Sequence, residues 1–375
     1  MARKQEMRVQ NLLKANAGLL FAGVATFILM GAGQALYGPA LPAFSRSFGL
    51  GLGTVGLVIS AHWIGCALGV AGMFWRGPQV SPRHVIVMMG LGSALVASGL
   101  GWPAVLLGAM VFGAGYGCAT VVFNPRMLRA FGPRGTAMLS LLNATFGIGA
   151  IGAPLLFVAL GNDPFLAFAA FAGFAALIWL GAGPASRPEA AAVAVAVKPF
   201  RLHLPILAFC MVAIGLEATL IGLGPAALIA AGETEIHAAQ LLSLFFLAFL
   251  AARVTLTFTA HLLPAFTLYT VALTAAFVAA VGAALLDPGA CFVILGACAG
   301  MFFPGGYVTA THKMGHDPRV PPTIIAAGLI GGIAAPLILS PFLEAMGERG
   351  FFWIIALLAG GLSLAAWINL RRMNH

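Results

Sequence analysis

The sequence predicts an all-α membrane protein with twelve transmembrane helices, arranged as two pseudo-symmetric six-helix bundles. Of its 375 residues, 61% are hydrophobic and only 8% are charged, whereas about a quarter of the residues in soluble domains are charged. Apolar runs recur along the whole chain, each near the ~20 residues that a helix needs to cross a bilayer. A motif in the fifth run returns in the eleventh, which predicts that the two halves are repeats.

The apolar runs divide evenly between the two halves of the chain. They are 17–42, 50–74, 84–100, 103–125, 135–160 and 164–183, then 204–231, 237–260, 262–286, 289–311, 320–343 and 349–370. The third and fourth form one uncharged stretch that is too long for a single span, so we place a break at its GLGWP sequence. We expect an N-terminal bundle over 1–183, a cytoplasmic linker over 184–203 and a C-terminal bundle over 204–375.

The repeated motif reads NATFGIGAIGAPLL at 143–156 and GLIGGIAAPLI at 328–338. Its small residues allow two helix backbones to approach closely in lipid. The proline in each copy interrupts the intrahelical hydrogen bonds at a defined depth. We therefore expect the two halves to meet along these two tightly packed helices.

The distribution of charge predicts the orientation of the chain. The formal net charge is +9, and among the Lys and Arg residues only Arg46 and Arg349 fall in loops that we assign to the outside. Positive-inside bias explains this basicity without a nucleic-acid partner and places both termini in the cytoplasm, with the protein in the cell inner (plasma) membrane. The first apolar run is too long for a cleaved signal peptide and should remain attached.

Catalytic and metal-binding motifs are missing from the sequence. Its five cysteines have no CxxC spacing and lie in apolar runs, so we interpret them as packing residues. All three aspartates fall in predicted loops, and there is no HExxH, DxxD or phosphate-binding GxxxxGK[ST] loop. We expect neither an enzyme nor an ATP-driven pump, and we expect no cofactor and no metal.

Several motifs together resemble the major facilitator superfamily over the whole chain. These are the six-plus-six arrangement, the basic linker and the paired motif, while QALYGPALPAF (34–44) is similar to the usual first-helix ending and IGLGPAAL (221–228) is its partner. LNATFGIGA (142–150) resembles the branch that contains fucose, glucose and galactose proton symporters. The loop between the second and third helices, GMFWRGPQVSPR (72–83), departs from the superfamily signature because it has no Asp.

This resemblance implies a secondary active transporter in which the two bundles rock around a site near the membrane midplane. We expect a monomer whose partners are a small solute, protons and the lipid bilayer. Proton-coupled symport of a small polar, sugar-like solute is the leading hypothesis. Proton-driven export of a more apolar, drug-like or aromatic metabolite is the alternative, because the chain offers one buried acid, few polar groups and many aromatic residues.

Two titratable residues are candidates for proton coupling. Glu217 is the only acidic residue inside a predicted span, about 20 Å into the seventh helix at ~1.5 Å per residue. An ionised carboxylate there is costly, so we expect it to be protonated, paired or open to a water-filled cavity. His62 lies midway along the second helix, and an imidazole is suited to a proton relay. The alternative for both is a hydrogen-bonded contact between helices.

The remaining candidates contact the solute or act at a gate. Asn143 opens the repeated motif, and the resemblance to the sugar-symporter branch implies that it contacts the substrate. The expected cavity wall also includes Gln34, Tyr37, Tyr116 and Tyr307. Two arginines near the predicted cytoplasmic boundary are candidates for gating, with snorkelling to lipid headgroups as the alternative; they are Arg126 and Arg253.

Overall fold

The computed structural model describes residues 12–76, 80–183, 185, 201–259, 261–315, 317 and 319–374. These residues are almost entirely helical, and they contain no strand. Eleven helices are long and apolar enough to cross a membrane, and a twelfth apolar helix, Pro82–Ala97, is shorter. The prediction of an all-α, twelve-helix membrane protein is therefore confirmed. Most of the predicted linker, 184–203, lies outside the described residues.

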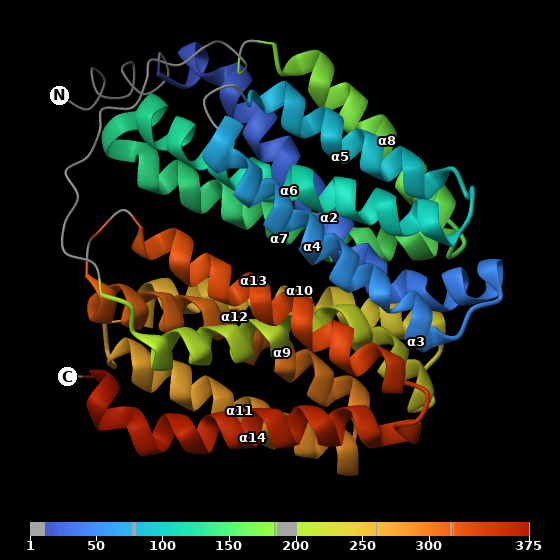
Figure 1. Cartoon of the computed structure of the whole chain (residues 1–375), viewed down its shortest axis with the longest axis vertical. Coiled ribbons are helices and arrows are strands. Elements are labelled where there is room, and N and C mark those ends of the chain that lie inside the picture. Colours follow the sequence, from blue (N-terminus) through green and yellow to red (C-terminus); the bar gives the residue numbers. More distant parts are fainter. Residues whose placement is uncertain are drawn as a thin grey trace.

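In the part of the chain that the structure describes, the twelve apolar helices form two groups, one from each half of the chain (Figure 1). The first half contains α2 (Ala17–Phe48), α3 (Leu52–Val55), α4 (Leu57–Arg76), α5 (Pro82–Ala97), α6 (Trp102–Phe131), η2 (Gly132–Arg134), α7 (Gly135–Ala159) and α8 (Pro164–Gly181). The second half contains α9 (Leu204–Ala230), α10 (Glu235–Thr259), α11 (Ala265–Leu285), α12 (Pro288–Met314), α13 (Val320–Leu339), η4 (Ser340–Phe342) and α14 (Gly347–Asn374). In Figure 1 the first group lies above the second.

The predicted break in the long uncharged stretch is confirmed, because α5 ends at Ala97 and α6 begins at Trp102. Two helices run further than their apolar runs predicted. α2 continues through Pro39 and Pro42 to Phe48, and α6 continues through Pro125. Neighbouring helices can satisfy the backbone groups that a proline frees in a membrane helix, so proline does not mark the helix end here.

Glycines hold pairs of helices in backbone contact. A Cβ atom at Gly149 of α7 would collide with the carbonyl oxygen of Ile28 in α2, and one at Gly331 of α13 would collide with that of Met211 in α9. Both contacts lie within one half, whereas we expected the glycines of this motif to join the two halves. The halves meet along other positions of the same helices, where Gly147 of α7 faces Leu250 of α10.

The two ends of the bundle differ in charge. We call the end that carries Asp163, Glu233, Glu235, Asp287 and Glu344 the acidic end. We call the opposite end, with Arg129, Arg134, Lys313, Arg319 and Arg372, the basic end. In Figure 1 the acidic end is on the right.

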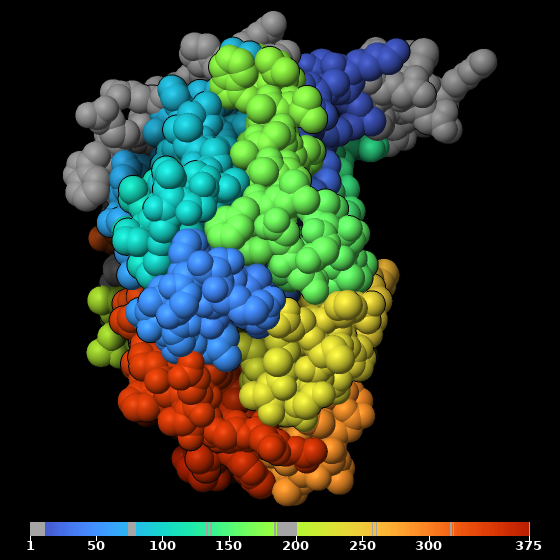
Figure 2. All heavy atoms as spheres, turned by 90° about the vertical axis from the view of Figure 1, so that its right-hand side faces the viewer, coloured from blue at the N-terminus to red at the C-terminus, as the bar shows by residue number. Residues whose placement is uncertain are grey.

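The two halves are joined at the acidic end. Arg46 of α2 forms an ion pair with Glu235 of α10. The backbone N–H of Leu52 in α3 donates to Oε1 of Glu344 at 2.6 Å, and Ser340 Oγ donates to the carbonyl oxygen of Gly53 at 2.8 Å. Figure 2 views this end and shows the blue segment that contains α3 resting on the red and yellow helices of the second half.

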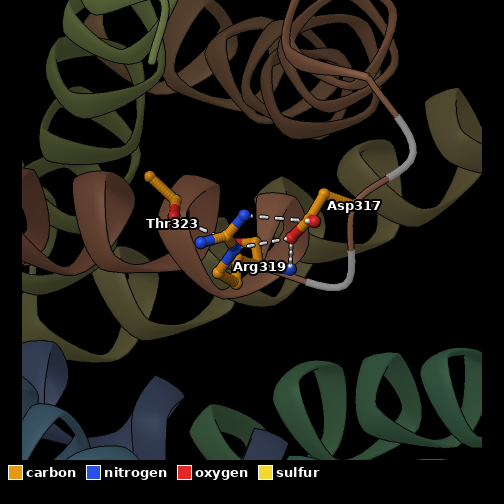
Figure 3. Close-up of polar contacts among 3 residues, drawn as sticks. All are labelled: Asp317, Arg319 and Thr323. Carbon is orange, nitrogen blue, oxygen red and sulfur yellow. Dashed lines mark hydrogen bonds and ion pairs between the residues drawn. The ribbon is translucent and has the colours of Figure 1, made fainter. Parts of the chain in front are cut away.

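At the basic end, the buried carboxylate of Asp317 lies just before α13 (Figure 3). Asp317 is 2% exposed and accepts hydrogen bonds from the backbone N–H and from Nε of Arg319, at 2.9 and 2.8 Å. Thr323 Oγ1 donates to the carbonyl oxygen of Arg319 at 2.8 Å. These contacts fix the first turn of α13.

The glycine contacts predict a contrast between two neighbouring substitutions. Gly149→Ala should destabilise the protein by about 1–3 kcal/mol, because its methyl group meets backbone that cannot rotate away. Gly152→Ala, one turn further along α7, should be neutral or stabilising, because nothing lies within 4 Å of the added carbon. Thermal unfolding of the purified variants measures the difference, and equal melting temperatures for the two would contradict the contact.

Candidate functional site

A cavity of about 140 Å³ lies between the two halves. Five helices around it contribute most of its wall, and α4 contributes one residue. The lining residues are Phe27, Met30, Gln34, Trp63, Tyr116, Thr120, Asn143, Phe146, Glu217, Ile221, Phe246, Phe249 and Arg253. We call this the central cavity.

The central cavity opens toward the basic end. Asn143 and Phe146 lie in the half of α7 nearer that end, Arg253 lies in the corresponding half of α10, and Asn143 is exposed. On the acidic side the halves close over it. A Cβ atom at Gly38 of α2 would lie 2.6 Å from the carbonyl oxygen of Ile221 in α9, and Ser60 Oγ of α4 donates to the carbonyl oxygen of Ile333 in α13 at 3.1 Å.

Opposite charges face this cavity without forming an ion pair. Glu217 of α9 lines the wall, and its Oε2 atom is buried without a hydrogen-bond partner. Arg253 of α10 also lines the wall, but its Nε donates to the carbonyl oxygen of Gly300 at 3.1 Å. Its guanidinium carbon lies 4.2 Å from the ring centre of Phe249. Backbone and aromatic contacts thus hold Arg253 in place while the carboxylate of Glu217 keeps its acceptor capacity.

Gln34 and Tyr116 lie on the wall and are bonded to each other. Tyr116 donates its hydroxyl hydrogen to Oε1 of Gln34 at 2.9 Å. This bond joins α6 to α2 and leaves the amide nitrogen of Gln34 as a donor. Asn143 donates to the carbonyl oxygen of Leu139 at 3.0 Å, one turn back along α7. Its amide oxygen is therefore presented at the mouth.

His62 and Tyr37 lie beside the central cavity, around a second cavity of about 10 Å³. The two cavities share Gln34, Trp63 and Ile221 in their walls. Both ring nitrogens of His62 and the hydroxyl of Tyr37 are buried without hydrogen-bond partners. A space of this size is close to the volume that one water molecule occupies.

Two predicted residues lie elsewhere. Tyr307 of α12 packs against Phe303, with ring centres 5.4 Å apart, and does not line the central cavity. Arg126 of α6 donates to the carbonyl oxygen of Ala185 at 3.2 Å and lies outside the cavity wall. Of the predicted residues, the central cavity brings together Gln34, Tyr116, Asn143, Glu217 and Arg253.

Sequence reasoning missed most of the aromatic wall. Phe246, Phe249 and Arg253 follow one another at spacings of three and four, which puts them on one face of α10. That spacing around a charged residue was the available signal. Thr120 and Phe146 gave no comparable pattern, because the helices that carry them are apolar all round.

Chemically, the site offers hydrogen-bonding and ionic groups in an aromatic enclosure. Among the described residues, no three His, Cys, Asp or Glu side chains group as ligands for a metal. Four of the five cysteines are buried, and all five are free thiols. The arrangement suits reversible binding of an organic molecule and exchange of a proton at a carboxylate.

Comparison with known proteins gives one family. A family model described as Major Facilitator Superfamily matches residues 23–321. Solved structures with the same fold include the nucleoside transporter NupG (14% identity, 94% of this chain and 99% of that one, TM-score 0.76). They also include a D-xylose-proton symporter (15%, 93% and 97%, 0.72) and the E. coli fucose:proton symporter FucP (17%, 93% and 98%, 0.62). No curated protein matches by sequence.

The one-sided opening predicts different reactivity for two engineered cysteines. In a background with Cys291→Ser, which removes the native thiol that is not fully buried, Asn143→Cys should react readily with a water-soluble maleimide. Ser60→Cys should react slowly, because Ser60 is 1% exposed on the closed side. Mass spectrometry of the time course measures both rates, and equal rates would contradict a cavity closed at the acidic end.

Proposed function

Because this chain belongs to the major facilitator superfamily, and is therefore a membrane transporter and not an enzyme, we propose that it couples proton movement to transport of a small polar solute. The observation that carries this proposal is the Glu217 carboxylate, which faces the central cavity with one oxygen unpartnered. The moving units would be the bundles 1–183 and 204–375, which rock about the cavity.

Proton coupling follows from the cost of a charge in this setting. A carboxylate in a partly dry cavity is stable when it is protonated, hydrated or close to a positive charge. Arg253 faces the same cavity. A change of conformation alters the hydration of Glu217 and its distance from Arg253, and it therefore alters the free energy of the charged carboxylate. A proton then binds more strongly in one conformation than in the other, and that difference shifts the conformational equilibrium.

His62 is proposed as a relay. Its unpartnered ring nitrogens border the small cavity that shares Gln34 and Trp63 with the central one. A single water there would connect the imidazole with the hydroxyl of Tyr37. Protons could then move along α4 and α2 toward the acidic side without passing through the bound solute.

The solute class is argued from the wall. Gln34, Thr120 and Asn143 offer donors and acceptors to hydroxyl groups, while Trp63 and Phe246 offer flat apolar faces. A compact ring that carries several hydroxyl groups matches both features. Solved structures of the same fold include transporters named for a nucleoside, D-xylose and fucose, and uptake of a sugar-like solute by symport remains the first choice.

The aromatic wall also favours a second candidate. Six of the thirteen residues that line the central cavity are aromatic, a proportion suited to a flat apolar compound. Export of a drug-like or aromatic metabolite against proton entry is therefore the alternative. A panel of sugars, nucleosides, vitamins and hydrophobic cations, tested for proton flux in proteoliposomes, separates the two: a hydroxylated ring solute that moves in the same direction as protons supports symport, and a hydrophobic cation that moves against them supports export.

The orientation in the membrane rests on the charges at the two ends. Positive-inside bias assigns the basic end to the cytoplasm of a cell inner membrane. Both termini are then cytoplasmic, and the conformation described here is inward-open. Arg126, near the end of α6, donates to the carbonyl oxygen of Ala185, which follows α8. It would anchor these two segments to each other at the basic end.

The coupling role of Glu217 is tested by Glu217→Gln, which keeps the shape of the side chain and removes its charge. Accumulation driven by a pH gradient should fall more than about tenfold, because the conformational equilibrium no longer depends on proton binding. Exchange of labelled solute across the membrane without a gradient should persist. Both rates are measured in proteoliposomes with the solute that the panel identifies.

Glu348→Gln is the matched control, because Glu348 is an exposed acid in the first turn of α14. It should retain both rates. Full gradient-driven accumulation in Glu217→Gln would remove this carboxylate from the coupling mechanism.

A further inference from the structure

A cavity of about 330 Å³ lies at the basic end of the second half, formed by the start of α11 and the ends of α12 and α14. Its lining residues are Pro264, Ala265, Phe266, Thr309, His312, Lys313, Met373 and Asn374. It shares no residue with the central cavity. Two of the eight are basic side chains and none is acidic, so the wall is suited to an anion.

Fixed donors surround this space. Lys313 Nζ donates to the carbonyl oxygen of Arg372 at 2.7 Å, which holds the ammonium group at the wall. Asn374 Nδ2 donates to Oγ1 of Thr267 at 2.9 Å, which orients the amide at the opposite side of the opening. The two bonds tie the last turn of α14 to α12 and α11, so the three walls are held together.

The first turn of α11 adds backbone donors. Pro264 is its N-cap residue, and no side chain caps the turn. The N–H groups of Ala265 and Phe266, both of which line the cavity, have no acceptor within the helix. The positive end of the helix dipole adds to the attraction for an anion.

Positive charge is concentrated beside the cavity. His203, just before α9, has a pKa lowered first by burial and then by Lys313 and Arg372. Arg371 and Arg372 lie in the last turn of α14. The cations of this region therefore repel an additional positive charge, and an anion in the cavity would relieve that repulsion.

The faces that lead from the cavity toward the membrane interior are apolar. Val271 and Val278 on α11, and Leu364, Trp367 and Ile368 on α14, are all exposed on the surface. Among the described elements, α14 packs mainly against α11 and α9 and slightly against α12. Its other side therefore faces lipid. A ligand that suits both regions carries an anionic head and hydrocarbon tails.

We propose that this cavity binds the phosphate group of an anionic phospholipid, with Lys313, His312 and the first turn of α11 around the head group and the acyl chains along α11 and α14. A zwitterionic choline head group brings its ammonium next to Lys313 and binds more weakly. Bound lipid bridges α11, α12 and α14 and stabilises the second half.

The test uses the purified full chain in detergent, with its melting temperature as the readout. Phosphatidylglycerol, phosphatidylcholine or inorganic phosphate is titrated into the wild type, Lys313→Gln and Lys14→Gln. Phosphatidylglycerol should raise the melting temperature of the wild type by about 3 °C or more. Phosphatidylcholine and inorganic phosphate should have little effect. Lys313→Gln should lose most of the shift.

Lys14→Gln is the matched control, because Lys14 is an exposed cation close to the start of α2, and it should keep the full shift. Asn374→Asp changes a second residue of the cavity wall, which is exposed, and its added negative charge should also abolish the shift. This variant keeps the proposal testable if Lys313→Gln does not fold. Equal shifts with the two phospholipids, an unchanged shift in both cavity variants, or a shift with inorganic phosphate alone would overturn the proposal.

Discussion

The backbone contacts of Gly149 with Ile28 and of Gly331 with Met211 determine where the cavity walls stand. Lipid supplies no hydrophobic force to bring helices together, so association depends on close van der Waals packing. These contacts fix α7 against α2 and α13 against α9. The first contact therefore sets the distance between Gln34 of α2 and Asn143 of α7, and the second holds α9, which carries Glu217, against α13.

The spacing between Ile28 and Met211 recurs in other helix pairs and relates the walls of the cavity to each other. Gly113 meets the carbonyl oxygen of His62, and Gly296 meets that of Phe245, with 183 residues between corresponding members. In this register Gln34 corresponds to Glu217. The amide oxygen of Gln34 accepts a hydrogen bond from Tyr116, whereas Oε2 of Glu217 has no hydrogen-bond partner. Of these two corresponding positions, only the one in the second half carries an acidic side chain.

Much of the fold and part of the site could be predicted from the sequence. Apolar length gave the twelve helices and the break before Trp102, and burial of a charge singled out Glu217. Helix rotation could not be predicted, because helices that are apolar all round have no face to orient. Tyr307 was expected at the cavity and lies away from it, while Phe249 was missed. Glycine contacts between helices set these rotations, and the composition of a single helix does not show which glycines make them.

The glycine contacts within each half differ in kind from the polar contacts that join the halves at the acidic end. Inside a half, glycines bring backbone against backbone, and any relative movement costs packing along a whole helix. Between the halves, the acidic end is joined by Arg46 with Glu235 and by Glu344 with the N–H of Leu52. Exposed ion pairs contribute only about 0–1 kcal/mol each. These polar contacts therefore add little to the packing of Gly38 of α2 against the backbone of Ile221 in α9, which holds the halves together on the closed side of the cavity.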